Sequence, residues 1–98
     1  MTVYVVAQLE FTDEPRYRRY QAAFPAVWVK YRGQVLANEE RPKVLEGEWK
    51  GSKVVLLSFP DEAAYHEWAD SDEYRTIAKD RLGGADTVSL LLRGLAAH

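Results

Sequence analysis

The chain has 98 residues, enough for one compact domain, and we expect a single domain over residues 1–98. Hydrophobic residues make up 47% of the chain and aromatic residues 12%, which excludes a disordered polypeptide. Thirteen basic and fifteen acidic residues are mixed along the chain, giving a net charge of -2, so no nucleic acid partner is expected. The absence of cysteine excludes disulfides, thiolate metal sites and thiol catalysis.

The beginning of the chain carries no targeting signal that we recognise. The run MTVYVVAQLEF lacks the basic start, long apolar core and small-residue cleavage site of a secretory signal peptide. No apolar run approaches the ~20 residues needed to span a bilayer. We therefore expect no membrane partner, and a cytoplasmic location.

The first third of the chain predicts a strand followed by a long helix. Residues 2–11 are rich in β-branched and aromatic side chains, which is typical of a strand. Over 14–32, aromatic and aliphatic residues recur every three or four positions, which predicts a helix capped by Asp13 and closed by Gly33. Pro25 lacks a backbone N–H, so we expect it to kink or interrupt this helix.

The remainder of the chain predicts four strand-like segments and a second helical region. The segments share an aliphatic and β-branched character and lie at 34–40, 43–49, 53–59 and 86–94. The helical region covers 61–84. It is expected to break near Ser71, because a serine followed by two acidic residues is a favourable start for a new helix.

An internal similarity indicates how these elements are arranged. FTDEPRYRRY at 11–20 and FPDEAAYHEW at 59–68 agree at Phe, Asp, Glu and Tyr, and both end in an aromatic residue. A duplicated strand-helix-strand unit gives the order βαββαβ, and we predict an α+β, ferredoxin-like fold with a four-stranded antiparallel sheet. The alternative is a chance similarity between two capped amphipathic helices.

The strands also predict self-association. An antiparallel sheet covered by helices on one side should alternate apolar and polar residues, yet VYVVA, VVLLSF and VSLLL are apolar on both faces. A chain of this size has no further layer to cover the second face. We therefore expect a homodimer joined through the sheet faces. The alternative is a sheet that tolerates exposed aliphatic residues.

Several motifs resemble a known bacterial family. They are VLEGEW, the SFP that ends a strand, SDEYRTIAKDRLGGAD, and the tyrosine and proline spacing of YQAAFPAVWVKYRG. Over nearly the whole chain the sequence is similar to the family called domain of unknown function 1330, within the dimeric α/β-barrel superfamily. The resemblance implies a ferredoxin-like protomer whose sheet pairs with a second subunit to form a barrel. It departs at YRGQ, where family members tend to carry paired glycines followed by arginine.

The histidine in DEAAYHEWADSDEY lies on a charged helix flank. Glu62, His66 and Asp70 follow one another at four-residue steps, away from the apolar side of the helix. We expect a solvated, charge-paired surface. The alternative is a rim histidine that holds a divalent ion weakly. His98 is expected to have no role, and no metal or cofactor is predicted.

A ligand pocket is predicted between sheet and helices, because so many large rings are hard to interlock completely in a small core. The ligand-binding candidates are the rings of Trp28, Trp49, Trp68 and Tyr74. The catalytic candidates are charged residues that lie at element ends and match the family's motifs: Glu46, Arg81 and Asp86. Arg81 would hold an anionic or carbonyl oxygen, and Glu46 would act as a base or fix Arg81 by an ion pair.

Other chemistries have little support in the sequence. The glycines of RLGGAD end a helix instead of opening one, which is the wrong polarity for a phosphate site. Two function classes stay open. One is a binder or enzyme acting on a small, partly apolar or aromatic molecule, with cofactor-free oxygenation or isomerisation as its chemistry. The other is a noncatalytic dimeric module with a structural or regulatory role.

Overall fold

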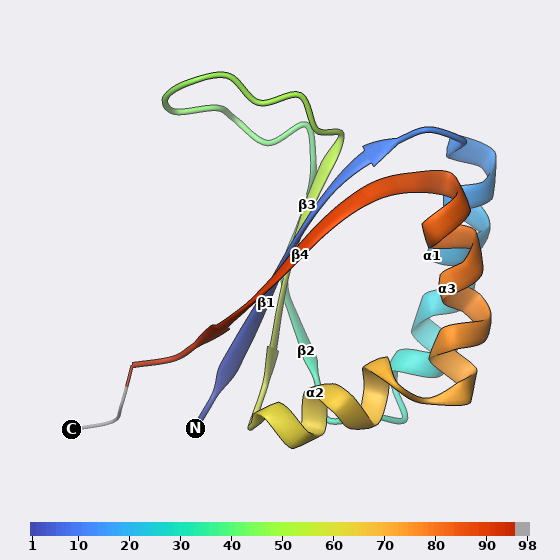
Figure 1. The fold of residues 1–98 in the computed structure, drawn as a ribbon, viewed down its shortest axis with the longest axis vertical. Coiled ribbons are helices and arrows are strands. Elements are labelled where there is room, and N and C mark those ends of the chain that lie inside the picture. The colour runs from blue at the N-terminus through green and yellow to red at the C-terminus, as the bar shows by residue number, and fades with distance from the viewer. Residues whose placement is uncertain (96–98) are drawn as a thin grey trace.

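The computed structural model describes residues 1–95 and has the order βαββαβ, with the second helical region divided in two (Figure 1). His98 lies outside the described residues. In chain order the elements are β1 (Val3–Phe11), α1 (Glu14–Trp28), β2 (Gln34–Glu40), β3 (Lys53–Phe59), α2 (Glu62–Ala69), α3 (Asp72–Gly84) and β4 (Ala85–Arg93). Over residues 1–95, none of the helices is both long and apolar enough to cross a membrane.

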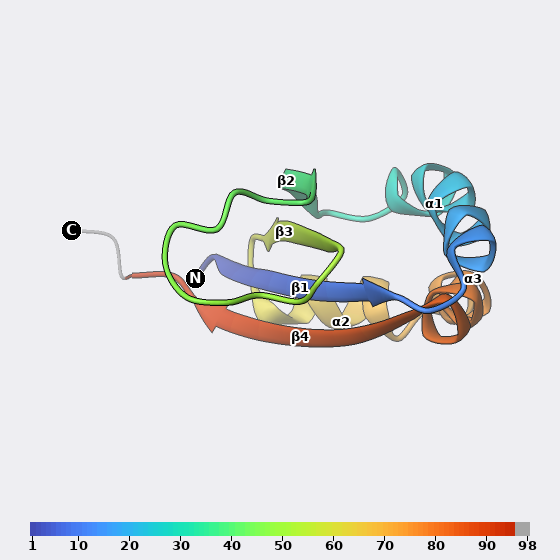
Figure 2. The ribbon, with the colours of Figure 1, turned by 90° about the horizontal axis from the view of Figure 1, so that it is seen from above.

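The four strands form one antiparallel sheet with the order β2-β3-β1-β4. The central strand β1 pairs with β3 and β4, so that Val5 lies opposite Leu57 on one side and Leu91 on the other. Helices α1 and α3 lie side by side at one end of the sheet, and α2 lies along its flank (Figures 1 and 2). This arrangement confirms the predicted α+β, ferredoxin-like fold.

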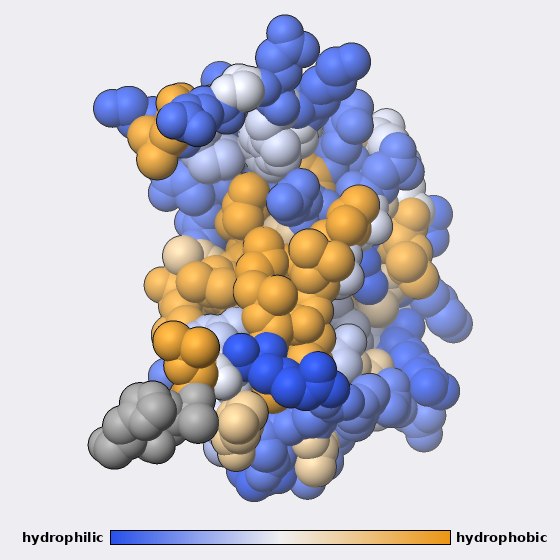
Figure 3. Space-filling model, turned by 60° about the vertical axis from the view of Figure 1, so that its left-hand side comes forward, coloured by the Kyte–Doolittle hydropathy of each residue, from blue (hydrophilic) through white to orange (hydrophobic). Residues whose placement is uncertain are grey.

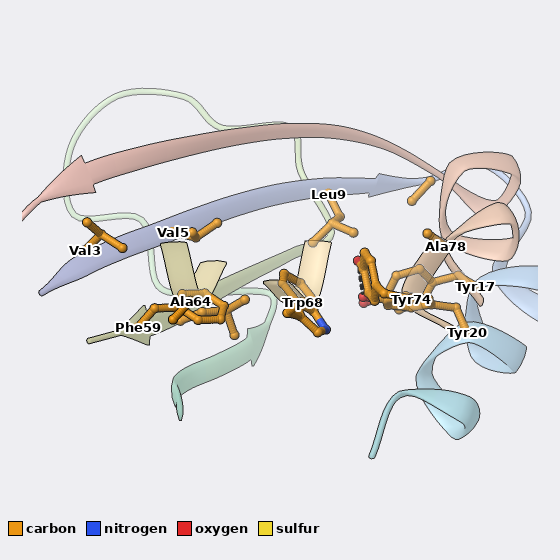
Figure 4. Packing of buried hydrophobic residues seen from close by; sticks show 12 residues of the cluster. Val3, Val5, Leu9, Tyr17, Tyr20, Phe59, Ala64, Trp68, Tyr74 and Ala78 are labelled. Carbon is orange, nitrogen blue, oxygen red and sulfur yellow. Dashed lines mark hydrogen bonds between the residues drawn. The ribbon is translucent and has the colours of Figure 1, made fainter. Parts of the chain in front are cut away.

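One side of the sheet faces the helices and carries the core. Val5, Leu9, Leu57 and Phe59 alternate along β1 and β3 and are almost fully buried. They pack against rings from the helices, among them Trp68 (Figure 4). We call this the helix-facing side. Side chains pack closely against this side near Phe59. At the end toward α1 and α3 they leave a pocket.

Within residues 1–95, no helix covers the opposite side of the sheet. Along β4, Val88, Leu90 and Leu92 are 58%, 52% and 50% exposed. Val6 and Leu56 from the neighbouring strands share this side, as the register and the alternation along each strand require. A space-filling view shows a broad hydrophobic area on this side of the molecule (Figure 3). We call it the open face. The prediction of strands apolar on both faces is confirmed.

All three helices begin with a side-chain cap. Asp13, Asp61 and Ser71 each accept a hydrogen bond from the backbone N–H three residues later, at 3.2, 2.8 and 3.1 Å. The predicted break at Ser71 is confirmed. The two similar segments of the sequence thus begin their helices in the same way, each with an aspartate.

The prediction for the end of the first helix is wrong. Helix α1 continues through Pro25 without interruption and ends at Trp28, one turn short of the predicted Gly33. Pro25 removes one backbone hydrogen bond, and the helix ends three residues later. The chain then folds back over the ring of Trp28. A Cβ on Gly33 would collide with that ring and with Phe59, so a glycine is required at this turn.

The strand-like segment 43–49 is also predicted wrongly. It belongs to a loop over 41–52 that projects beyond the sheet (Figure 1). Arg41 and Gly47 have φ values of 58° and 81°, which turn the chain out of an extended conformation. Pro42 lacks the N–H that a strand would donate. The apolar residues of this loop are therefore not paired into the sheet.

Candidate functional site

A pocket of about 450 Å³ lies between the helix-facing side of the sheet and the three helices. Its volume falls within the range of small-molecule sites, about 300–1,000 Å³. Aliphatic residues of β1 and β3 form its floor. Its walls are aromatic rings contributed by every helix: Tyr17, Tyr20, Phe24, Tyr65, Trp68 and Tyr74.

Two tyrosines join α1 and α3 at the wall of the pocket. The hydroxyl groups of Tyr20 and Tyr74 lie 2.8 Å apart and share one hydrogen bond. Burial raises the pKa of Tyr20, so its phenol stays neutral at physiological pH. The ring of Trp68 lies 4.1 Å from that of Tyr74 between centroids, and its indole nitrogen points toward the tyrosine pair (Figure 4). The pair fixes the helices that form the wall.

Three buried polar atoms of the pocket residues make no hydrogen bond within residues 1–95. They are Trp68 Nε1, Arg81 Nε and Thr87 Oγ1. The first two can only donate. An unpaired buried donor costs about 1–3 kcal/mol, so each of these donors favours binding of an acceptor that removes this cost. The arrangement suits a ligand with a carbonyl, phenolic or carboxylate oxygen.

A lysine also lines this pocket. Lys53, the first residue of β3, is only 2% exposed, and its ammonium lies 5.0 Å from the centre of the Tyr17 ring. Its cross-strand neighbour Glu40 is held by Arg18 through contacts of 2.6 and 2.8 Å. Burial is the largest cause of the lowered pKa of Lys53; Glu40 opposes the shift and Arg18 adds to it. The site thus contains an amine whose burial makes it easier to deprotonate than an exposed lysine.

His66 lies outside this pocket, on an exposed flank of α2. Its ring nitrogens lie 3.5 Å from Glu62 and 3.3 Å from Asp70, and all three side chains are about half exposed. This is the exposed helix flank expected from the sequence, with a carboxylate four residues to either side of the ring. In the described part of the chain, no group of three or more His, Asp or Glu side chains has the geometry to hold a metal ion.

The structure brings three of the predicted site residues together. Trp68, Tyr74 and Arg81 all line the pocket, from α2 and α3. Trp28 lies one layer behind, with its ring edge-on to Trp68 at 5.0 Å between centroids. It supports the wall without forming it.

The other three predicted site residues lie away from the pocket. Trp49 is in the loop over 41–52, and its Nε1 donates to Oε1 of Gln8 at 3.3 Å, on the side of the open face. Glu46 is exposed in the same loop. Asp86 is exposed on β4 opposite Glu10, also on that side. A role for these residues stays a prediction and would have to operate outside the pocket.

Sequence analysis did not single out Lys53, Thr87 or Tyr20. Lys53 begins KVVLLSF and falls on the same side of the strand as Val55 and Phe59, so the two-residue period already places it inward. Thr87 is inward by the same rule. The alternation was thus a usable signal, but the residues' convergence on one pocket depends on the curvature of the sheet and the tilt of the helices.

A family model described as domain of unknown function (DUF1330) matches residues 2–95. The chain belongs to this family. The resemblance noted in the motifs is therefore confirmed. No curated protein matches the chain.

Solved structures agree with the fold. A Rhodopseudomonas palustris protein of unknown function, RPA0582, has a TM-score of 0.81 at 17% identity, with 98% of this chain and 84% of that chain covered. A dimeric ferredoxin-like protein of unknown function from Jannaschia sp. CCS1 has a TM-score of 0.73 at 13% identity, covering 96% and 100%. SnoaB from Streptomyces nogalater, described as a cofactor-independent oxygenase, has 0.68 at 13%, covering 98% and 95%. At these identities the likeness shows the shared fold alone.

Proposed function

We propose that the pocket binds a small, partly apolar aromatic molecule that carries an acceptor oxygen. The observation that carries this proposal is the set of unpaired buried donors, Trp68 Nε1 and Arg81 Nε, in a pocket walled by aromatic rings. Rings would stack on the ligand and the donors would fix its oxygen. In a packed core with no ligand function, these unpaired donors would destabilise the folded protein and serve no purpose.

Turnover of the bound molecule is the second part of the proposal. SnoaB, which shares the fold, is described as a cofactor-independent oxygenase. The pocket of this DUF1330 protein offers aromatic walls and buried donors. Arg81 would stabilise negative charge on the ligand oxygen. Oxygen uptake measured with each ligand that binds tests this part.

Ligand binding is tested by thermal shift and calorimetry with benzoate, 4-hydroxybenzoate and 1,4-naphthoquinone. Trp68→Phe keeps an aromatic ring but removes the N–H, so the affinity for the best ligand should fall about five- to tenfold, the value of one hydrogen bond. Arg81→Ala should weaken it further. Trp49→Phe is the matched control, because Trp49 lies outside the pocket and should leave affinity unchanged.

The outcomes separate the two function classes. A ligand that loses affinity with Trp68→Phe and keeps it with Trp49→Phe supports the pocket. An equal loss of affinity in the two variants would indicate that the ligand binds at another site. If none of the three compounds stabilises the protein, the noncatalytic dimeric module becomes the better account.

We also infer that the protein is a homodimer joined through its open faces and works in the cytoplasm. The support is the uncovered aliphatic surface of β4, with Leu90 and Leu92 half exposed, and the description of the Jannaschia protein as dimeric. Light scattering at micromolar concentration should give about twice the 11.2 kDa mass of the chain. A mass equal to that of one chain would contradict the inference.

A further inference from the structure

We propose that Lys53 forms an imine with an aldehyde or ketone bound in the pocket. This inference rests on the proposed binding function and narrows it to carbonyl compounds. It assigns a nucleophile to a site in which Arg81 and Trp68 supply only donors. The reacting group is the side-chain amine, and the bond formed is a carbon–nitrogen double bond.

The first argument is the position of the lysine. Lys53 is almost fully buried at the start of β3, and it lines the same pocket as Tyr17, Trp68 and Arg81. Lysine is among the residues least often buried, and those that are buried are normally paired. In the described part of the chain no carboxylate forms an ion pair with Lys53, since Arg18 holds Glu40.

The second argument is the chemistry of its surroundings. A buried ammonium without a counter-ion is destabilised relative to the neutral amine. The structure offers it the face of Tyr17 at 5.0 Å, which compensates part of this cost. Burial therefore lowers the pKa of Lys53, despite the opposing charge of Glu40. A neutral amine is the form that attacks a carbonyl.

The reaction balances without a cofactor. The lone pair of Lys53 Nζ attacks the carbonyl carbon and gives a carbinolamine. Both amine hydrogens then leave with the former carbonyl oxygen as water, and the imine remains. The pocket's buried donors, Trp68 Nε1 and Arg81 Nε, would polarise the carbonyl before the attack.

The test uses 4-hydroxybenzaldehyde with sodium cyanoborohydride, which reduces the imine to a stable secondary amine. The full-length protein is digested and analysed by mass spectrometry. We expect Lys53 to gain the mass of the aldehyde less one oxygen atom, at a rate at least ten times that of the exposed Lys43 and Lys50. Lys53→Arg keeps the positive charge and should abolish this adduct without changing the modification of Lys43 and Lys50.

A second ligand separates this inference from the proposed function. 4-Hydroxybenzyl alcohol has nearly the same shape but no carbonyl, so it binds without condensing. Binding of both compounds without a faster adduct at Lys53 would overturn the imine and leave the binding function intact. If neither compound binds, both proposals fail. An adduct that forms equally on Lys43, Lys50 and Lys53 would also overturn the inference.

Discussion

The two sides of the sheet differ in what accompanies their apolar residues. On the helix-facing side, Leu9 and Leu57 lie beside Lys53 and Thr87, so buried polar groups are set among aliphatic and aromatic ones. On the open face, exposed aliphatic residues such as Leu90 dominate the middle of the sheet (Figure 3). An exposed aliphatic surface fits another apolar surface, whereas a pocket with buried donors fits a small molecule with a polar end. We therefore propose that one sheet serves assembly on one side and binding on the other.

The largest effect is expected on the open face. Leu90→Glu places a carboxylate on the open face, on the edge strand β4, where pairing with a second copy would bury it at a cost of several kcal/mol. The variant should be monomeric by light scattering at micromolar concentration. Leu82→Glu is the control, because Leu82 is 67% exposed on α3 and away from the sheet. A dimeric Leu90→Glu protein would show that assembly uses another surface.

On the helix-facing side, Lys53→Met should make the protein more stable. The change removes an ammonium that is buried without a carboxylate and keeps a flexible chain of similar length. We expect the free energy of unfolding to rise by about 1 kcal/mol in urea titrations, because the desolvation of a charge outweighs its attraction to one ring. The exposed Lys50→Met should change it by less than about 0.5 kcal/mol.

A loss of stability in Lys53→Met would contradict this account, since it would mean that the lysine is there for structure. A gain would identify Lys53 as a residue kept at a cost to stability, which is common for functional groups. The result therefore sharpens the contrast between the two sides of the sheet.

An effect of about the same size is expected only at high pH. Burial raises the pKa of Tyr17 to about 12 from 10.0, mainly by desolvation, although Arg18 and Arg81 oppose the shift. The folded state therefore holds its proton more tightly than the unfolded state. This stabilisation is complete below pH 10 and is lost as the pH rises toward 12. Tyr17→Phe should reduce the loss of stability between pH 9 and pH 11 by about 1 kcal/mol.

The measurement is a series of urea titrations of both proteins at those two pH values. Lys53 shifts in the opposite direction, since the pKa of the folded state is lowered and stability from this group increases as pH rises toward the unfolded value. That contribution is common to both proteins and cancels. Identical pH dependence in the two proteins would place the Tyr17 hydroxyl in contact with water.

Much of the fold could be predicted because it depends on local patterns. The aspartate before each of the first two helices and the serine before α3 are caps whose effect is confined to one turn. The end of α1 could not be predicted, because it depends on how Trp28 packs beneath Gly33. The segment 43–49 was predicted wrongly because its apolar residues have the pattern of a strand. The backbone turns at Arg41 and Gly47 prevent a strand from forming there.

The candidate site was less predictable than the fold. Trp68, Tyr74 and Arg81 were chosen for ring size, charge and family motifs, and they do meet at the pocket. Trp49 satisfies the same criteria yet lies on the other side of the sheet. This could not be predicted, because composition does not tell which side of the sheet a loop follows. Predicting Lys53 as a site residue would have required the strand register as well as its charge. A site is defined by convergence in space, and local patterns carry little of that information.

The central claim is that the helix-facing pocket is the place where a ligand binds. The three tryptophans offer the most direct test, because each has one indole N–H signal in a proton–nitrogen correlation spectrum. On titration with 4-hydroxybenzoate, the signal of Trp68 should move the most, because its unpaired N–H gains an acceptor oxygen. The signal of Trp49, which already donates to Gln8, should stay in place. A shift of Trp49 with an unchanged Trp68 would contradict the account.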